Sequence, residues 1–204
     1  YGSFNTFKNT VKFSTGLLND HFEIAGRLSA LKSDGYVDRA SSDLKSYFLQ
    51  GTYIGKTTLI KALVFGGTEK TYQSWFGVDA ATLESDRTFN AAGMFIDTSG
   101  NTRFYDNQTD NYQQDHYQLF FNHQYNNQLS FNITGFLTRG RGYYEEYKKN
   151  EELKNYPFPK TVIDTVLFKR SNLIRQLWLD NYFYGNTYAL QYKSATDEIA
   201  LGSS

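Results

Sequence analysis

The sequence predicts an all-β fold of antiparallel strands, and three observations carry this prediction. Polar and apolar residues alternate with a period of two in about seven separate runs. Short connections rich in Asn, Asp and Gly separate some of these runs, and longer polar connections separate the others. Only 2 of the 204 residues are proline, as expected for a chain held mostly in hydrogen-bonded ladders.

The clearest strand pair lies in residues 115–139, DHYQLFFNHQYNNQLSFNITGFLTR. Two alternating runs of about ten residues flank Asn126-Asn127, which is the pattern of a β-hairpin. The second run has one apolar face and one face of amides and hydroxyls. The apolar face carries Leu129, Phe131, Ile133 and Leu137, and the polar face carries Ser130, Asn132 and Thr134.

These two faces favour an antiparallel transmembrane β-barrel, in which apolar residues face lipid and polar residues face the lumen. A soluble β-sandwich with one wet face gives the same alternation. The runs at 5–18, 21–32 and 44–53 follow the pattern. The run at 57–67 is apolar on both faces apart from Lys61, and this one charge, which a wet lumen accommodates better than lipid, predicts that Ile60, Ala62 and Val64 point outward. The run at 173–193 is longer than a bilayer is thick, so we expect it to project beyond the membrane.

The connections predict a polarity of the barrel. Short turns near residues 19–20, 54–56, 126–127 and 194–197 alternate with longer connections, so turns and loops should occupy opposite ends. Two of the connections, about 66–111 and 140–171, lack sustained alternation and are expected to be long loops, with a short helix near 145–153 where Glu and Lys gather. Barrels of this class have short periplasmic turns, which puts the long loops outside the cell.

Composition excludes several function classes. The 21 basic and 21 acidic side chains give a formal net charge of +0, so nothing points to nucleic acid. There is no cysteine, and no apolar run reaches the roughly 20 residues of a transmembrane helix. The three histidines are isolated, and Asp106, Asp110 and Asp115 lack the spacing of a calcium loop. We therefore expect no enzyme activity, no metal site and no cofactor.

Several stretches resemble the TonB-dependent outer-membrane receptors in the form found in Bacteroidota. They include HFEIAGRLSALKSDGYVDRASSDLKSYFLQGTY, TLIKALVFGGTEKTYQSWFGV, DNQTDNYQQDHYQLFFNHQ and LIRQLWLDNYFYGNTYALQYK. The resemblance implies that residues 1–204 are a β-barrel segment of a barrel of about 22 strands occluded by a plug domain. The plug, the segment that contacts TonB and the remaining barrel strands are not among the matching stretches. Implied partners are therefore outer-membrane lipid, those remaining parts and the TonB complex.

A ligand should contact loop and lumen residues. The best candidates are Tyr72, Gln73, Trp75 and Phe76, because aromatic and amide groups stack on and hydrogen-bond a bulky ligand. The alternative is a purely structural role, in which Trp75 and Phe76 pack under their own loop. Arg139 and Arg141 are candidates for binding an anion, against a role as solvated residues at the start of a loop.

The expected function is import of a scarce, large nutrient across the cell outer membrane of a Gram-negative bacterium. The cargo classes left open are an iron–siderophore complex, haem, cobalamin and an oligosaccharide. A soluble β-sandwich that binds glycans is the alternative from another class, and a complete small barrel of about eight strands is a third.

Overall fold

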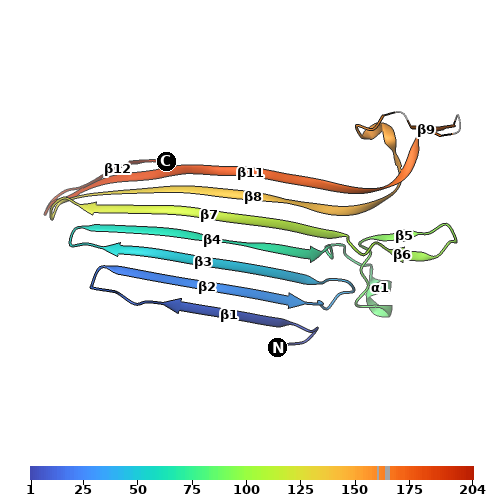
Figure 1. Ribbon diagram of the computed structural model, residues 1–204, viewed down its shortest axis with the longest axis horizontal. Helices are drawn as coiled ribbons and strands as arrows, with labels where there is room; N and C mark the ends of the chain where they lie inside the picture. Colours follow the sequence, from blue (N-terminus) through green and yellow to red (C-terminus); the bar gives the residue numbers. More distant parts are fainter. Residues whose placement is uncertain (160, 164–165) are drawn as a thin grey trace.

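The computed structural model describes residues 1–159, 161–163 and 166–204 and consists mainly of one antiparallel sheet (Figure 1). Its eight strands follow the order β1-β2-β3-β4-β7-β8-β11-β12, and each neighbouring pair is antiparallel. The strands are β1 (Phe7–Ser14), β2 (Phe22–Ser33), β3 (Ser42–Ile54), β4 (Thr58–Tyr72), β7 (Thr109–Gln124), β8 (Leu129–Glu152), β11 (Arg170–Lys193) and β12 (Glu198–Ser203).

Because of the strand register, the two faces of the central hairpin continue across the whole sheet. We call the face with Leu129, Phe131, Ile133 and Leu137 the outer face, and the face with Ser130, Asn132 and Thr134 the inner face. Ile133 lies opposite Phe121, and Phe121 lies opposite Ile60. Directly paired residues point to the same side of a sheet. Ile60, Ala62 and Val64 therefore lie on the outer face, as Lys61 predicts.

The outer face is apolar and exposed. Val11, Leu28, Leu119 and Leu201, from four different strands, are each more than half exposed. Among the described residues, only two hydrophobic side chains are buried, Tyr72 and Ala92. A β-sandwich needs a buried core between two facing sheets. The main sheet has no such core, so the sandwich alternative is wrong.

The sheet is also open, since its first strand β1 and its last strand β12 form no pair with each other within the described residues. A complete small barrel would close through that pair. The structure is therefore a β-barrel segment with two free edges, and the expectation of a complete eight-stranded barrel is wrong.

Turns and loops occupy opposite ends, as predicted (Figure 1). The turns are residues 15–21, 55–57, 125–128 and 194–197, and the loops are 34–41, 73–108 and 153–169. The loops are shorter than expected because the strands run further, with β4 ending at Tyr72, β7 starting at Thr109 and β8 ending at Glu152. Residues 160, 164 and 165 of the second predicted loop lie outside the described residues.

The helix expected near 145–153 is wrong. Residues up to Glu152 belong to β8, and only Leu153–Asn155 form a turn of 3-10 helix. The long partner strand explains the difference, because β11 pairs with β8 as far as Arg170 opposite Glu152. The charged side chains are used across the ladder, where Arg175 pairs with Glu146. Ladder pairing therefore overrides helix propensity here.

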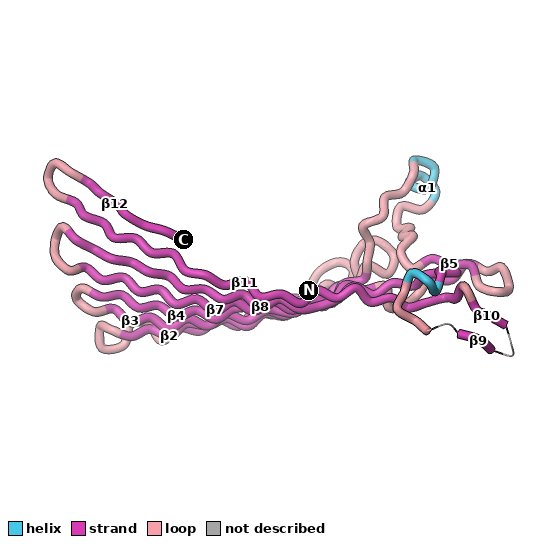
Figure 2. Tube along the Cα trace, turned by 90° about the horizontal axis from the view of Figure 1, so that it is seen from above, coloured by secondary structure: helices cyan, strands magenta, loops and turns pink. Residues whose placement is uncertain are grey.

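The loop 73–108 has structure of its own. It contains the short helix α1 (Ala80–Ser85) and the hairpin β5 (Met94–Ile96) and β6 (Thr102–Phe104). In Figure 2, α1 stands away from the sheet on one side, whereas β5 continues roughly along the line of the long strands. The loop 153–169 contains the small hairpin β9 (Thr161–Ile163) and β10 (Val166–Phe168). Within the described residues, no helix is long and apolar enough to cross a membrane.

Candidate functional site

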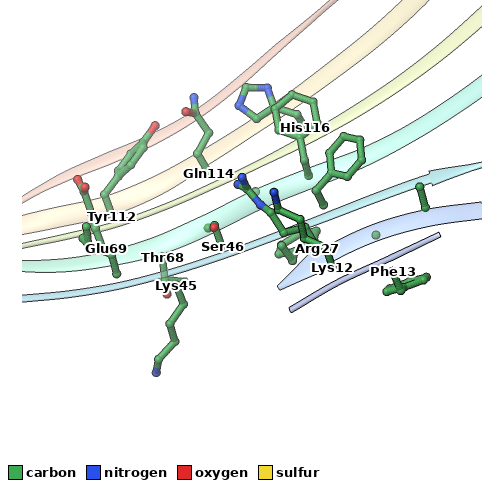
Figure 3. Close-up of a pocket in the computed structure, with 18 of the residues that line it drawn as sticks. Lys12, Phe13, Arg27, Lys45, Ser46, Thr68, Glu69, Tyr112, Gln114 and His116 are labelled. Carbon is green, nitrogen blue, oxygen red and sulfur yellow. The ribbon is translucent and has the colours of Figure 1, made fainter. Parts of the chain in front are cut away.

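The inner face bears a hollow, whose lining side chains are drawn in Figure 3. The hollow has a volume of about 1160 Å³ and is lined by β1, β2, β3, β4 and β7. Most of its polar lining comes from inner-face positions, which alternation places on one side of every strand. These positions are Lys12, Ser14, Arg27, Ser46, Glu69, Tyr112, Gln114 and His116.

Two cations meet directly across the first strand pair of this hollow. Lys12 lies opposite Arg27 in the β1–β2 register, and both side chains are exposed. Like charges directly opposite in a sheet repel one another. Neither residue has an ion-pair or hydrogen-bond partner among the described residues. The pair is therefore a local concentration of positive charge that suits an anionic group.

Aromatic rings form a row beside these cations. Phe65 stacks on the His116 ring with centroids 4.5 Å apart and planes inclined by 11°, and Phe48 lies 6.5 Å on the other side of Phe65. The His116 Nδ1 atom lies 2.9 Å from the Thr138 hydroxyl, which fixes the ring orientation. His116 thus lies on the inner face, and its ring contributes to a flat, partly apolar wall.

Trp75 and Phe76 lie on the loop that follows β4, and they are exposed by 64% and 53%. The Trp75 ring makes an edge contact with Tyr144, at 6.5 Å between centroids. Tyr144 lies on the inner face, since it has the parity of Ser130 and Thr134 on the same strand. Trp75 therefore sits at the inner side of the rim and is not packed under its own loop.

Tyr72 and Gln73 are buried, at 5% exposure each, and hold the loop instead of facing solvent. The Tyr72 hydroxyl lies 2.8 Å from the Tyr105 carbonyl oxygen and 3.1 Å from that of Ala92. Gly93 has a φ of +74°, and an added Cβ there would approach the Tyr72 hydroxyl at 2.6 Å. Only glycine fits this close crossing.

Arg139 and Arg141 lie on the outer face, with the parity of Leu137. Arg139 makes an ion pair with Asp180 and stacks over the Tyr182 ring at 4.2 Å. Arg141 donates to the Gln113 side-chain oxygen at 3.0 Å. The structure therefore separates the two groups of candidates, with Trp75 at the inner rim and both arginines on the outside of the wall.

A buried carboxylate, which sequence reasoning missed, joins the loop 73–108 to the outer face of β8. Glu145 is 6% exposed and accepts hydrogen bonds from the Tyr105 hydroxyl, from Asn107 at 2.6 Å and from Gln176 at 2.7 Å. Burial alone raises the pKa of the Glu145 carboxyl, but these three donors outweigh it and leave the pKa below its usual value. Burial and the same contact raise the pKa of Tyr105 to about 12.

Sequence reasoning also missed the hollow, since Lys12 and Arg27 read as ordinary polar positions on separate strands. Among the described residues, no cluster of three or more His, Asp or Glu side chains is arranged to hold a metal ion. The site is thus a wall with a cationic and aromatic inner surface, topped by a loop that exposes two aromatic side chains.

These features define a class of protein, an open segment of an antiparallel β-barrel wall. No protein-family model matches the chain, and no curated protein matches it. Two solved structures are similar along 98% of the chain, both of the ferric-catecholate import receptor Fiu from E. coli K12. The closed form has 13% identity and the open form 14%, each with a TM-score of 0.64.

The chain spans about a third of the receptor's length, 29% of the closed form and 32% of the open form. At this level of identity the likeness establishes the fold alone. It agrees with the open eight-stranded sheet, because a partial barrel has free edges where the remaining strands would pair.

Proposed function

We propose that this chain is part of the barrel wall of a TonB-dependent outer-membrane receptor that imports a scarce, large nutrient. The observation that carries the proposal is the alignment of 98% of the chain with the barrel of an import receptor. The apolar, exposed outer face supports contact with outer-membrane lipid. The free edges of β1 and β12 support pairing with the remaining strands, around the plug that this family carries.

Among the cargo classes, the inner hollow favours an anionic and partly aromatic one. Lys12 and Arg27 supply uncompensated positive charge, and the Phe48–Phe65–His116 row supplies a stacking surface. An anionic iron–siderophore complex combines both properties, and so does haem through its propionates and flat macrocycle, whereas neutral cobalamin or an uncharged oligosaccharide makes no use of the cations. The likeness to a ferric-catecholate receptor points to the same class of cargo.

The loop candidates take distinct parts in this proposal. Trp75 and Phe76 contact the ligand at the rim, because they are exposed and Trp75 lies on the inner side. Tyr72 and Gln73 position that stretch from below. Arg139 and Arg141 lie on the outer face, so an anion that they bind would lie on the outside of the wall. It would also have to replace Asp180 as the partner of Arg139.

The test is a binding panel with the receptor in detergent, using an iron–catecholate complex, haem, cobalamin and a neutral oligosaccharide. We expect the anionic iron complex to bind, and Lys12→Glu together with Arg27→Glu to weaken it by roughly tenfold or more, since each replaces an attractive charge with a repulsive one. Trp75→Ala should weaken binding independently.

Lys56→Glu is the matched control. It makes the same charge change as each of the two substitutions taken singly, on an exposed residue of the turn 55–57. Equal losses in this control and in the hollow variants would show a general electrostatic effect and remove the hollow from the site. Failure of every panel member to bind the unmodified receptor would contradict the proposed function.

A further inference from the structure

The loop 73–108 contains an exposed arm, residues 74–89, whose two ends are tied together. Residues 74–81 and 83–87 are all exposed, whereas Gln73 and Asn90 on either side are buried, at 5% and 1% exposure. The Asn90 side-chain amide donates to the Gln73 carbonyl oxygen at 2.9 Å. A surface loop of this length with adjoining ends is an Ω-loop, a form that frequently carries function.

Asn90 makes more contacts than this one, and together they form the neck of the arm. Its amide also donates to the Asp38 carbonyl oxygen at 3.0 Å, and its side-chain oxygen accepts from the Ala92 backbone N–H at 3.0 Å. Its own carbonyl oxygen accepts a hydrogen bond from Arg39. Asp38 and Arg39 belong to the loop 34–41, so the neck is fastened to a neighbouring loop as well.

The rest of the loop is fastened separately, on the outer face of β8. Glu145 holds Tyr105 and Asn107, and the Phe95 ring packs against Tyr147 at 4.4 Å between centroids. The Lys149 ammonium donates to the Ile96 carbonyl oxygen at 2.9 Å. Apart from the edge contact of Trp75 with Tyr144, the arm is thus the one long stretch of the loop 73–108 that contacts little of the wall, and its two ends are held at the neck.

We propose that Asn90 is a positioning residue for the ligand site, closing the neck of the arm so that Trp75 and Phe76 are held at the inner rim. This inference rests on the proposed function for the role of those two aromatic residues. The neck itself stands on the geometry alone. Removing the Asn90 side chain takes a hydrogen-bond partner from the Gln73 and Asp38 carbonyl oxygens and from the Ala92 N–H. The bonds to Gln73 and Ala92 are buried, and leaving those groups unpaired is costly enough to open the neck.

The first measurement is tryptic cleavage after Arg87, the only lysine or arginine within 74–89. Cleavage there requires local opening of the arm. We expect Asn90→Ala to raise the rate by roughly tenfold or more, relative to cleavage after Arg103 in the same molecule. Asn90→Asp should do at least as much, because it turns a carboxylate toward the Asp38 and Gln73 carbonyl oxygens. Asn127→Ala, in the exposed turn 125–128 at the turn end of the sheet, is the matched control and should change nothing.

The second measurement is the fluorescence anisotropy of Trp75, in a background where Trp178, the other tryptophan of residues 1–204, and every tryptophan elsewhere in the receptor are replaced by phenylalanine. Asn90→Ala should lower the anisotropy and weaken ligand binding to the same degree as Trp75→Ala, with thermal unfolding of the barrel unchanged. Unchanged cleavage after Arg87 and unchanged anisotropy in Asn90→Ala would overturn the inference. If the unmodified receptor bound no panel member, the proposed function would fail, while the cleavage rates would still decide whether Asn90 closes the neck.

Discussion

Substituting arginine on the two faces of β8 tests which face meets lipid. Ile133 lies in the middle of the apolar outer run Leu129–Leu137, between Phe121 of β7 and Tyr188 of β11. Its neighbour in sequence, Asn132, lies on the inner face between Asn122 and Ala189. The two positions share one depth and one strand, so a difference between them reports only the face.

Ile133→Arg should lower the free energy of unfolding by about 2–4 kcal/mol, the cost of an arginine at the bilayer midplane. At 1.4 kcal/mol per decade this reduces the folding equilibrium constant by about 30- to 700-fold. Asn132→Arg should change it little, because a wet inner face hydrates the guanidinium and its flanking residues are an amide and an alanine.

The assay is reversible denaturant unfolding in phospholipid vesicles, followed by tryptophan fluorescence. Ile133→Leu serves as the control for packing, since it keeps the side chain apolar. Equal destabilisation by arginine at both positions would refute the assignment of faces. A larger loss at Asn132 would mean that the inner face is the drier one.

Three further predictions follow from the loop end. Asp180→Asn should change stability only slightly, because the Asp180 side chain is 63% exposed and water weakens its ion pair with Arg139, and chemical unfolding measures this. Because the pKa of the Glu145 carboxyl is lowered, its stabilising contribution is present above the ordinary carboxyl range and is lost as the pH falls through the lowered value. Amide hydrogen exchange should therefore show the loop 73–108 losing protection at acid pH, and Glu145→Gln should abolish that pH dependence. An epitope tag between Ser99 and Gly100, an exposed hairpin tip, should be detected on intact cells, and detection only after permeabilisation would reverse the orientation.

The faces and ends of the sheet were predictable because both are local properties of the sequence. Alternation in the hairpin determines which of Ile133 and Asn132 points outward, and turn composition determines where a strand reverses. Strand ends were not predictable in the same way. Residues 140–152 carry aromatic and charged side chains at both parities, so their alternation is invisible until β11 supplies an equally long partner. The length of β8 thus depends on its pairing with β11.

In the candidate site, too, some features were predictable from the sequence and others were not. The exposure of Trp75 and Phe76 follows from a loop rich in small and polar residues, which the sequence displays directly. The buried role of Tyr72 does not, because it depends on Gly93 and Tyr105, which lie far along the chain. Contacts between distant residues of a loop have no periodic signature, so Glu145 and Asn90 read as ordinary polar residues.

The inner face carries exceptions to the polar pattern, some of them in the hairpin and others in the hollow. Phe120 and Phe136 break the polar pattern of the inner face, and the ladder also brings Phe48 and Phe65 to that face. A sequence locally inconsistent with its fold often marks a functional position. Each exception is ambiguous alone, because a single phenylalanine on a wet face only exposes apolar area. In the hollow, the strand register joins single rings into one surface. Phe48 lies opposite Phe65, and Phe65 lies opposite His116. Together these rings border the cations of the neighbouring strands. An inner face that hydrates its amides yet keeps a row of aromatic rings beside unpaired cations has the chemistry of a surface that a ligand covers.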